Sequence, residues 1–327
     1  MFILPPTAYI TILDYGDLMD NPKVMTVTGA LEPGEMGLTL HHEHVMSTFG
    51  AESVRYPFYD QPRLFEVVPP YLLYLHSLGV RTLVDCTAAY FGRHAELLRQ
   101  FALGSRLHIL TNTGYYGAAD DRYVPPHAFS ETASQIAARW TREWTDSIDE
   151  TGIYPGFIKT AVDGGPLSEI DRKLIVAAAI THRHTGLTIQ THTGDNLPAA
   201  QAILEILAQQ GVHPSAWIWI HAHNLAEIGP ALQAAGQGAW ISFDGLHPDS
   251  AAHILELIQG MQAHGLLEHV LLSHDGDSYM NGQSRPYHFL MTDFIPMLKA
   301  HGFSEAAIQQ MVVTNPSRAY AVQIRER

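Results

Sequence analysis

The chain has 327 residues, of which 46% are hydrophobic and 16% charged, a composition that is ordinary for a globular enzyme with a large core. Its formal net charge is −14, and this excess of acid argues against nucleic acid or an anionic membrane surface as the main partner. A single cysteine excludes a disulfide within the chain, and no apolar run approaches the ~18–20 residues that a membrane span needs. We therefore expect a cytoplasmic protein.

The N-terminal part of the chain leads into a pair of histidines. Residues 1–35 are rich in proline and glycine, lack the pattern of a secretory signal, and are expected to be a leader that covers the core. The apolar run 36–40 predicts a short buried strand that continues into His42, Glu43 and His44. Side chains alternate along a strand, so the two histidines point the same way and Glu43 points away, which suggests a structural role for Glu43. Two adjacent imidazoles form half of a metal site, although they could also simply cap the strand.

Short apolar strands then alternate with helices along the rest of the chain. A helical pattern over 64–78 is interrupted by Pro69-Pro70 and ends at Gly79. Further strands are predicted at 81–87, 107–113, 156–161, 187–192, 217–221, 238–243 and 269–274. Helices are predicted at 93–103, 130–151 with Ser130 as the N-cap, 168–185, 198–210, 225–235, 250–264, 287–301 and 304–312.

This alternation predicts an α/β fold, a (β/α)8 TIM barrel with an N-terminal extension. Near-continuously apolar strands separated by helices indicate parallel pairing, and the first strand brings their number to eight. We expect one domain over residues 1–327, with the barrel at 36–327. An open doubly wound sheet would need a glycine-rich phosphate loop after the first strand, where this chain has histidines instead.

Titratable side chains gather at the ends of the predicted strands, where the catalytic groups of a barrel lie. Each has an ordinary explanation by itself, because a strand-end histidine is commonly a surface residue and an aspartate is common in turns. Five different strands supply them, however, and this convergence favours a metal site. The residues are His42, His44, Lys159, His192, His221 and the pair His274-Asp275.

Lys159 interrupts an apolar segment, so its amine would be partly desolvated and its neutral form favoured. A neutral amine can form a Schiff base, or it can react with CO₂ to give a carbamate that bridges two cations. Four histidines and an aspartate exceed the ligand number of one zinc ion, which favours two metals and a bridge. The only cysteine, Cys86, lies in an apolar run and is predicted to be a small buried hydrophobe rather than a catalytic thiol.

From residue 27 to residue 317 the sequence resembles the phosphotriesterase family of metal-dependent hydrolases, within the amidohydrolase superfamily. The match includes Gly-Leu-Thr-Leu-His-His-Glu-His at 37–44, Gly-Val-Arg-Thr-Leu-Val-Asp at 79–85 and Thr-Gly-Tyr-Tyr at 113–116. It continues with Gly-Phe-Ile-Lys at 156–159, Thr-His-Thr at 191–193 and Leu-Leu-Ser-His-Asp at 271–275.

The resemblance implies a role for each residue of the cluster. His42, His44 and Asp275 would hold a buried divalent metal, and His192 and His221 a more exposed one, with zinc the expected metal. An N6-carboxylated Lys159 and a hydroxide would bridge the two ions, and Asp275 would take the proton of the attacking hydroxide. Tyr116 matches a tyrosine that lies beside the substrate in lactonase-like members.

Two positions depart from the family pattern. After the sixth strand the usual His-Ser-Asp or His-Cys-Asp is replaced by His221-Ala222-His223. After the seventh strand, Asp followed by His or Arg is replaced by Asp244-Gly245. These positions form a proton relay and a substrate contact in some members, so we expect the relay to be absent or rebuilt through His223 or His247.

The predicted function is a binuclear metal-dependent hydrolase that attacks a lactone or a carboxylic ester, with phosphotriester hydrolysis as the alternative. The loop 277–287 would shape the pocket, and Arg285 and Tyr287 could clamp a carboxylate or phosphate, unless the loop is an ordinary polar lid. A metal-binding barrel without turnover and a Schiff-base lyase are the rivals from other classes. We expect a small-molecule substrate as the partner, and a homodimer formed through the loop 45–62 and the leader.

Overall fold

The computed structural model describes residues 21–327, so the first 20 residues of the predicted leader lie outside the described part. The rest of the leader forms an antiparallel hairpin of β1 (Val24–Thr26) and β2 (Gly29–Leu31), followed by the single turn η1 (Pro33–Glu35). Within residues 21–327, no helix combines the length and the apolar character that crossing a membrane requires.

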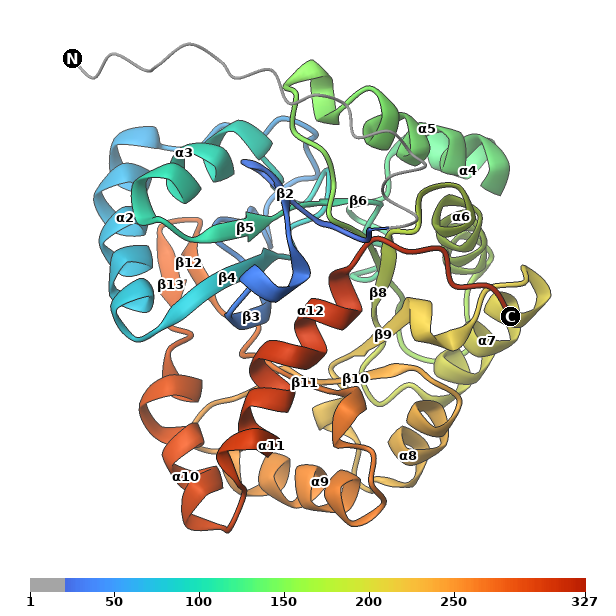
Figure 1. Ribbon diagram of the computed structural model, residues 1–327. Helices are drawn as coiled ribbons and strands as arrows, with labels where there is room; N and C mark the ends of the chain where they lie inside the picture. Colours follow the sequence, from blue (N-terminus) through green and yellow to red (C-terminus); the bar gives the residue numbers. More distant parts are fainter. Residues whose placement is uncertain (1–20) are drawn as a thin grey trace.

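The centre of the fold is a closed ring of parallel strands surrounded by helices (Figure 1). The strands are β3 (Leu38–Glu43), β4 (Val80–Asp85), β5 (His108–Leu110), β6 (Asn112–Thr113), β7 (Phe157–Ala161), β8 (Thr188–His192), β9 (Trp217–Ile220), β10 (Trp240–Phe243) and β11 (Val270–Leu272). The helices are α2 (Gln61–Ser77), α3 (Ala95–Ser105), α4 (Pro126–Ser130), α5 (Ala133–Thr145), α6 (Glu169–Thr185), α7 (Leu197–Gln209), α8 (Gly229–Gly236), α9 (Ala251–Ala263), α10 (Ile295–Ala300), α11 (Glu305–Gln309) and α12 (Asn315–Tyr320).

Backbone hydrogen bonds close the ring. One parallel sheet has the order β3-β4-β5 and the other the order β6-β7-β8-β9-β10-β11, and β5 and β6 are two halves of one strand separated by Thr111. Between the first and the last strand, the N–H of His44 donates to the carbonyl of Gly276 (2.8 Å) and the N–H of Asp275 to that of His42 (3.1 Å). The predicted (β/α)8 barrel is therefore confirmed.

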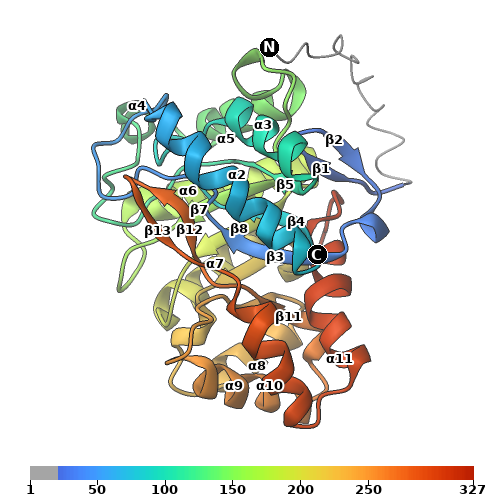
Figure 2. The same ribbon diagram turned by 90° about the vertical axis from the view of Figure 1, so that its left-hand side faces the viewer.

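Apolar side chains fill the barrel interior below the strand ends. Cys86 is fully buried there with its thiol 3.1 Å from Oε1 of Gln190, and burial raises the pKa of this thiol well above its usual value. This agrees with Cys86 as a buried hydrophobe rather than a nucleophile. Val24 of β1 belongs to the same cluster, so the described part of the leader closes one end of the barrel. The hairpin of β12 (Asp277–Met280) and β13 (Gln283–Arg285) lies on the opposite side (Figure 2).

Two predictions about the helices are wrong. Pro69 and Pro70 do not interrupt the first helix, because α2 continues through both. The carbonyls that lose their donors belong to residues 65 and 66, which are exposed, so water can satisfy them. The helix predicted at 130–151 ends earlier, and its N-cap is Thr132, which forms a capping box with Gln135.

His182 on α6 gives the fold a dependence on pH. It is buried, its Nδ1 donates to the carbonyl of Leu187 (2.9 Å), and its Nε2 accepts the N–H of Arg325 (3.0 Å), so the native contacts require a neutral ring. Burial lowers its pKa from 6.5 to about 4. Below pH 6.5 the unfolded chain therefore binds more protons than the folded one, and stability should fall by about 3 kcal/mol as the pH approaches 4.

We expect His182→Gln to lower the free energy of unfolding at pH 7 but to remove this part of its acid dependence. Urea unfolding between pH 4.5 and 7 measures both quantities, and His184→Gln, at an exposed position of the same helix, is the matched control. An unchanged pH slope in His182→Gln would show that another group is responsible.

Candidate metal centre

Three side chains converge where the first strand meets the last. His42 and His44 lie at the end of β3 and point to the same side, and Asp275 follows β11. The Oδ1 of Asp275 lies 3.5 Å from Nε2 of His42 and 3.3 Å from Nε2 of His44. One ligand atom from each residue lies within 4.8 Å of the others, a spacing that can hold a metal ion. Two imidazoles and a carboxylate suit a divalent transition metal.

A second pair of imidazoles meets on the neighbouring strands. His192 ends β8 and His221 follows β9, and Nδ1 of the first lies 2.8 Å from Nε2 of the second. Burial, followed by the influence of His221, lowers the pKa of His192 well below its usual value, which keeps the ring neutral as metal binding requires. The two nitrogens lie within hydrogen-bonding distance of each other at the wall of the same cavity.

Lys159 joins the two groups. It lies in the middle of β7, its side chain is only 1% exposed, and its Nζ is 3.2 Å from Nε2 of His42. No carboxylate within residues 21–327 forms an ion pair with it. Its amine is therefore buried beside the first ligand group without a carboxylate partner among the described residues. The donor set as a whole fits two metal ions.

The backbone is strained at two of these residues. His221 has a φ of 62° and Asp275 a φ of 56°, both in the left-handed region that only glycine adopts without cost. Their N–H groups are fixed, since His221 donates to Oδ1 of Asp244 (2.9 Å) and Asp275 to the carbonyl of His42. Strain held in place by such contacts is typical of functional sites.

Buried acceptors bind the Nδ1 atoms of His42 and His44, on the side of each ring that faces away from the cluster. The Nδ1 of His42 is hydrogen-bonded to Asp244, and the Nδ1 of His44 lies 2.8 Å from Oγ1 of Thr87. Each contact leaves Nε2 free to face the centre. Burial alone would raise the pKa of Asp244, but the imidazoles of His221 and His42 hold it well below its usual value, so Asp244 is ionised.

A cavity of about 210 Å³ opens above the cluster. One wall is aromatic: Phe91 stacks on Tyr116 with ring centroids 4.9 Å apart, and Phe49 packs edge-on against Phe91. The hydroxyl of Tyr116 lies 3.3 Å from Nδ1 of His192, so Tyr116 reaches the second pair of imidazoles. The cavity is lined by all six predicted ligands together with Phe49, Phe91, Tyr116, Asp277, Met280 and Arg285.

The two predicted clamp residues have different positions. Arg285, about half exposed at the rim of the cavity, donates from Nε to Oδ2 of Asp277 (2.6 Å). Tyr287 does not line the cavity: its ring is fully buried against Tyr71, and its hydroxyl is bonded to Ser278. The structure therefore does not place Tyr287 where it could contact a ligand.

Several other residues near the centre have structural roles or lie away from it. Glu43 points away from the cluster, as expected, and accepts hydrogen bonds from Oγ of Ser273 (2.8 Å) and from the N–H of Gly276 (2.7 Å). His274 is turned toward Glu43, with Nδ1 2.7 Å from its carboxylate, and so stays outside the metal cluster. Within residues 21–327, His247 forms its polar contacts with Asp249, Ser250 and Ala251, next to it in the chain, and it does not line the cavity.

Three residues that contribute to the site, Asp244, Phe49 and Phe91, were not predicted from the sequence. Asp244 was noted only because of the residue that follows it, although an acid at the end of a buried barrel strand is itself a signal. The aromatic wall from Phe49 and Phe91 comes from loops, where no periodic pattern marks a pocket residue.

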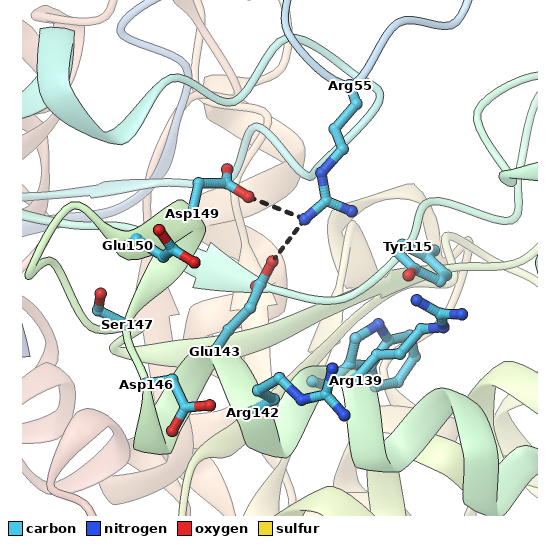
Figure 3. A pocket seen from close by; sticks show the side chains of 10 residues that line it. Arg55, Tyr115, Arg139, Arg142, Glu143, Asp146, Ser147, Asp149 and Glu150 are labelled. Atoms are coloured by element: carbon cyan, nitrogen blue, oxygen red, sulfur yellow. Dashed lines mark hydrogen bonds and ion pairs between the residues drawn. The ribbon is translucent and has the colours of Figure 1, made fainter.

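A second cavity of about 210 Å³ lies apart from the centre, between the loop after β3 and the end of α5. Figure 3 shows Arg55 reaching Asp149 and Glu143, with N–O distances of 2.8 and 3.7 Å. Glu143 is also bound by the buried guanidinium of Arg93 (2.7 Å). These ion pairs anchor the loop whose other end supplies Phe49 to the metal-centre cavity.

The sequence profile described as "Phosphotriesterase family" matches residues 22–320. The chain belongs to the phosphotriesterase family. It is therefore a member of a family of metal-dependent hydrolases. Within residues 21–327, two groups have ligand atoms close enough to hold a metal ion, His42-His44-Asp275 and His42-His221-Asp244.

Relatives match this family member over nearly their whole length. The "Phosphotriesterase homology protein" of Mycobacterium tuberculosis is 27% identical over 318 residues, covering 91% of this chain and 98% of the relative. A mutant organophosphorus hydrolase from Deinococcus radiodurans has a TM-score of 0.81 at 27% identity, covering 91% and 97% of the two chains. A structure described as organophosphate hydrolysis engineered from "a weak promiscuous lactonase template" has a TM-score of 0.81 at 27% identity, covering 91% and 100%.

Proposed function

We propose that this phosphotriesterase-family protein hydrolyses lactones or carboxylic esters with a binuclear zinc centre bridged by an N6-carboxylated Lys159. One observation carries the proposal: His42, His44, Lys159, His192, His221 and Asp275 line one cavity, with the hydroxyl of Tyr116 3.3 Å from His192. Six donors around an enclosed space exceed what a structural metal needs.

The ligands divide into two groups that share Lys159. His42, His44 and Asp275 would hold one ion, and His192 and His221 the other. Two ions bound in this way supply an activated water at neutral pH and polarise the scissile carbonyl oxygen. Carboxylation would give the buried Lys159 side chain the negative charge that this arrangement of donors favours.

Other residues of the cavity would move the proton and position the substrate. Asp275 would take the proton of the attacking water. Burial would raise the pKa of Asp275, but its hydrogen bond to His44 and the nearby imidazoles hold it below its usual value, so the carboxylate is ionised. The wall of Phe49, Phe91 and Tyr116 would take the apolar part of the substrate. Arg285 at the rim would meet a polar substituent through the N–H groups that Asp277 does not use.

Phosphotriester hydrolysis is the second candidate, and the likeness to an organophosphorus hydrolase favours it. Both reactions use the same nucleophile and differ in the geometry of the centre that is attacked. We favour the acyl substrate because Tyr116 occupies the position beside the cluster, and because one similar structure is described as built on a lactonase template.

A substrate panel on the zinc-loaded protein tests the proposal. We expect turnover of aliphatic lactones and activated carboxylic esters at higher kcat/KM than of a phosphotriester such as an aryl dialkyl phosphate. The reverse order would favour the second candidate. Full metal occupancy without turnover of any of these substrates would support a barrel that binds metal without catalysis, and activity that survives a chelator would support a Schiff-base lyase.

Replacing Tyr116 with phenylalanine should lower kcat/KM for lactones about tenfold and leave the metal content unchanged. The reason is that the variant loses one hydrogen bond at the substrate and keeps the aromatic wall. Tyr115→Phe is the matched control, because the Tyr115 hydroxyl faces His127, outside the cavity. Equal kcat/KM values for Tyr116→Phe and the parent would show that the Tyr116 hydroxyl does not bind the substrate.

We also propose that the protein is a cytoplasmic homodimer. The loop after β3 presents Tyr56 at 65% and Phe58 at 100% exposure, and α2 also exposes Phe65 and Leu73. Aromatic side chains are enriched at protein–protein interfaces. Light scattering should give about twice the mass of the chain, and Phe58→Ser should shift the protein toward the monomer.

A further inference from the structure

Asp244 connects the two halves of the metal centre. One carboxylate oxygen, Oδ2, is hydrogen-bonded to Nδ1 of His42, which belongs to the first ligand group. The other, Oδ1, accepts the backbone N–H of His221 (2.9 Å) and lies 3.3 Å from its Nδ1, in the second group. The rings of His42 and His221 are stacked with centroids 5.0 Å apart. The orientation of one carboxylate therefore sets the direction of both imidazoles.

A third imidazole completes the surroundings of Asp244. The Nδ1 of His223 lies 3.1 Å from Oδ1, and its side chain is 16% exposed, at the edge of the centre. The ring of His223 stands edge-on to that of His221, with centroids 5.7 Å apart. With this contact, three histidine rings from β3 and from the turn after β9 surround the same carboxylate.

The place of the His223 ring depends on a glycine. A Cβ atom at Gly245 would lie 2.1 Å from Nε2 of His223 and 2.5 Å from its Cδ2, far inside van der Waals contact. The φ of Gly245 lies outside the left-handed region, so its backbone does not itself require glycine. The structure therefore explains the glycine at position 245 by the space that the His223 ring occupies.

The turn that carries His223 is held from outside. Nε2 of His253, on α9, lies 3.1 Å from the carbonyl of His223 and 3.0 Å from that of Leu225. These contacts fix the backbone of the turn, so a side chain at position 245 would have to displace the His223 ring itself, away from Asp244.

We propose that His223 is a positioning residue of the metal centre, and that Gly245 is glycine in order to admit it. Together they hold Asp244 in the orientation that aims His42 and His221 at the metals. His223 itself touches neither metal nor substrate. The inference rests on the metal centre of the proposed function but not on the identity of its substrate.

The test measures metal retention instead of turnover. The zinc-loaded parent, His223→Ala, Gly245→Ala and the double variant are exposed to a chelator, and zinc release is followed with a chromogenic indicator. We expect each single variant to release zinc about tenfold faster, because Asp244, the partner of two metal-binding histidines, loses its support, and loss of such a partner typically costs about 10–100-fold in metal affinity. The double variant should be no worse than His223→Ala, because Gly245 acts only through that ring.

Two further variants separate positioning from general damage. His223→Asn retains an N–H near the position of Nδ1 and should recover most of the zinc retention that His223→Ala loses. His247→Ala, on an exposed neighbouring loop, should behave like the parent, and thermal unfolding shows whether each variant is folded. Cobalt substitution gives an independent readout, because His223→Ala should change the visible absorption of the bound cobalt.

The possible outcomes are distinct. Parent-like zinc release in Gly245→Ala, or effects of the two substitutions that simply add, would overturn the inference and leave the proposed function intact. A parent protein that binds no zinc would overturn the proposed function and the inference with it.

Discussion

Lys159→Ala is expected to lose most of its bound metal and about three orders of magnitude in kcat/KM for a lactone. The side chain is buried between the two ligand groups, with Nζ 3.2 Å from Nε2 of His42, and no other residue fills that position. Loss of metal-assisted stabilisation of developing charge is worth several kcal/mol, which corresponds to this factor. Metal analysis and steady-state kinetics of the purified variant measure both quantities.

Rescue by a small acid distinguishes a carboxylated lysine from other roles. Alanine leaves a buried space in which acetate or propionate can supply the missing carboxylate, so either anion should restore part of the metal content and of the activity. Lys299→Ala removes an exposed lysine that pairs with Glu305, and serves as the matched control. Unchanged metal content in Lys159→Ala would show that Lys159 does not bridge the two metals. Trapping of substrate on Lys159 of the parent protein by borohydride would indicate a Schiff base.

Asp275→Asn should be nearly inactive, with kcat reduced by at least about a thousandfold, while the fold is retained. Asparagine preserves the shape of the side chain, but its amide is a poor metal ligand and cannot accept the proton of the attacking water. Because Asp275 is itself a predicted ligand, the affinity for the first metal should fall as well.

Two comparisons make the Asp275 result interpretable. Asp249→Asn, at an almost fully exposed position, should match the parent in metal content and rate. Saturating zinc should restore occupancy of Asp275→Asn without restoring kcat. If added zinc recovers the full rate, Asp275 serves only as a ligand and the proton acceptor is another group.

The barrel could be predicted from the sequence because each of its strands is a nearly continuous apolar run. Such runs are typical of strands buried on both faces, and their observed bounds lie within a few residues of the predicted ones. The cluster followed from the same argument: a closed parallel barrel brings all carboxyl ends of its strands to one mouth, whichever residues they carry. The pairing of His192 with His221 on one ion was implied by the family resemblance, because convergence at one end of the barrel does not say which ligands share an ion.

Contacts between loops could not be predicted from the strand pattern. Tyr287 was predicted at the pocket from its place beside Arg285, but the chain turns after β13 and buries the ring against Tyr71. The joint role of Asp244 and His223 depends on the space above Gly245, which only the folded structure reveals. The start of α5 was a different case, because Ser130 and Thr132 are both good N-caps but only Thr132 has a glutamine three residues later, a local capping-box pattern that the prediction overlooked.

Zinc titration of the chelator-stripped protein, with lactone hydrolysis followed at each addition, tests the binuclear centre most directly. The proposed function predicts that two equivalents of zinc bind per chain and that the rate reaches its plateau only as the second equivalent is taken up. Binding of a single equivalent, or a rate that is already full with one ion or with none, would contradict a centre built from two ligand groups that share Lys159.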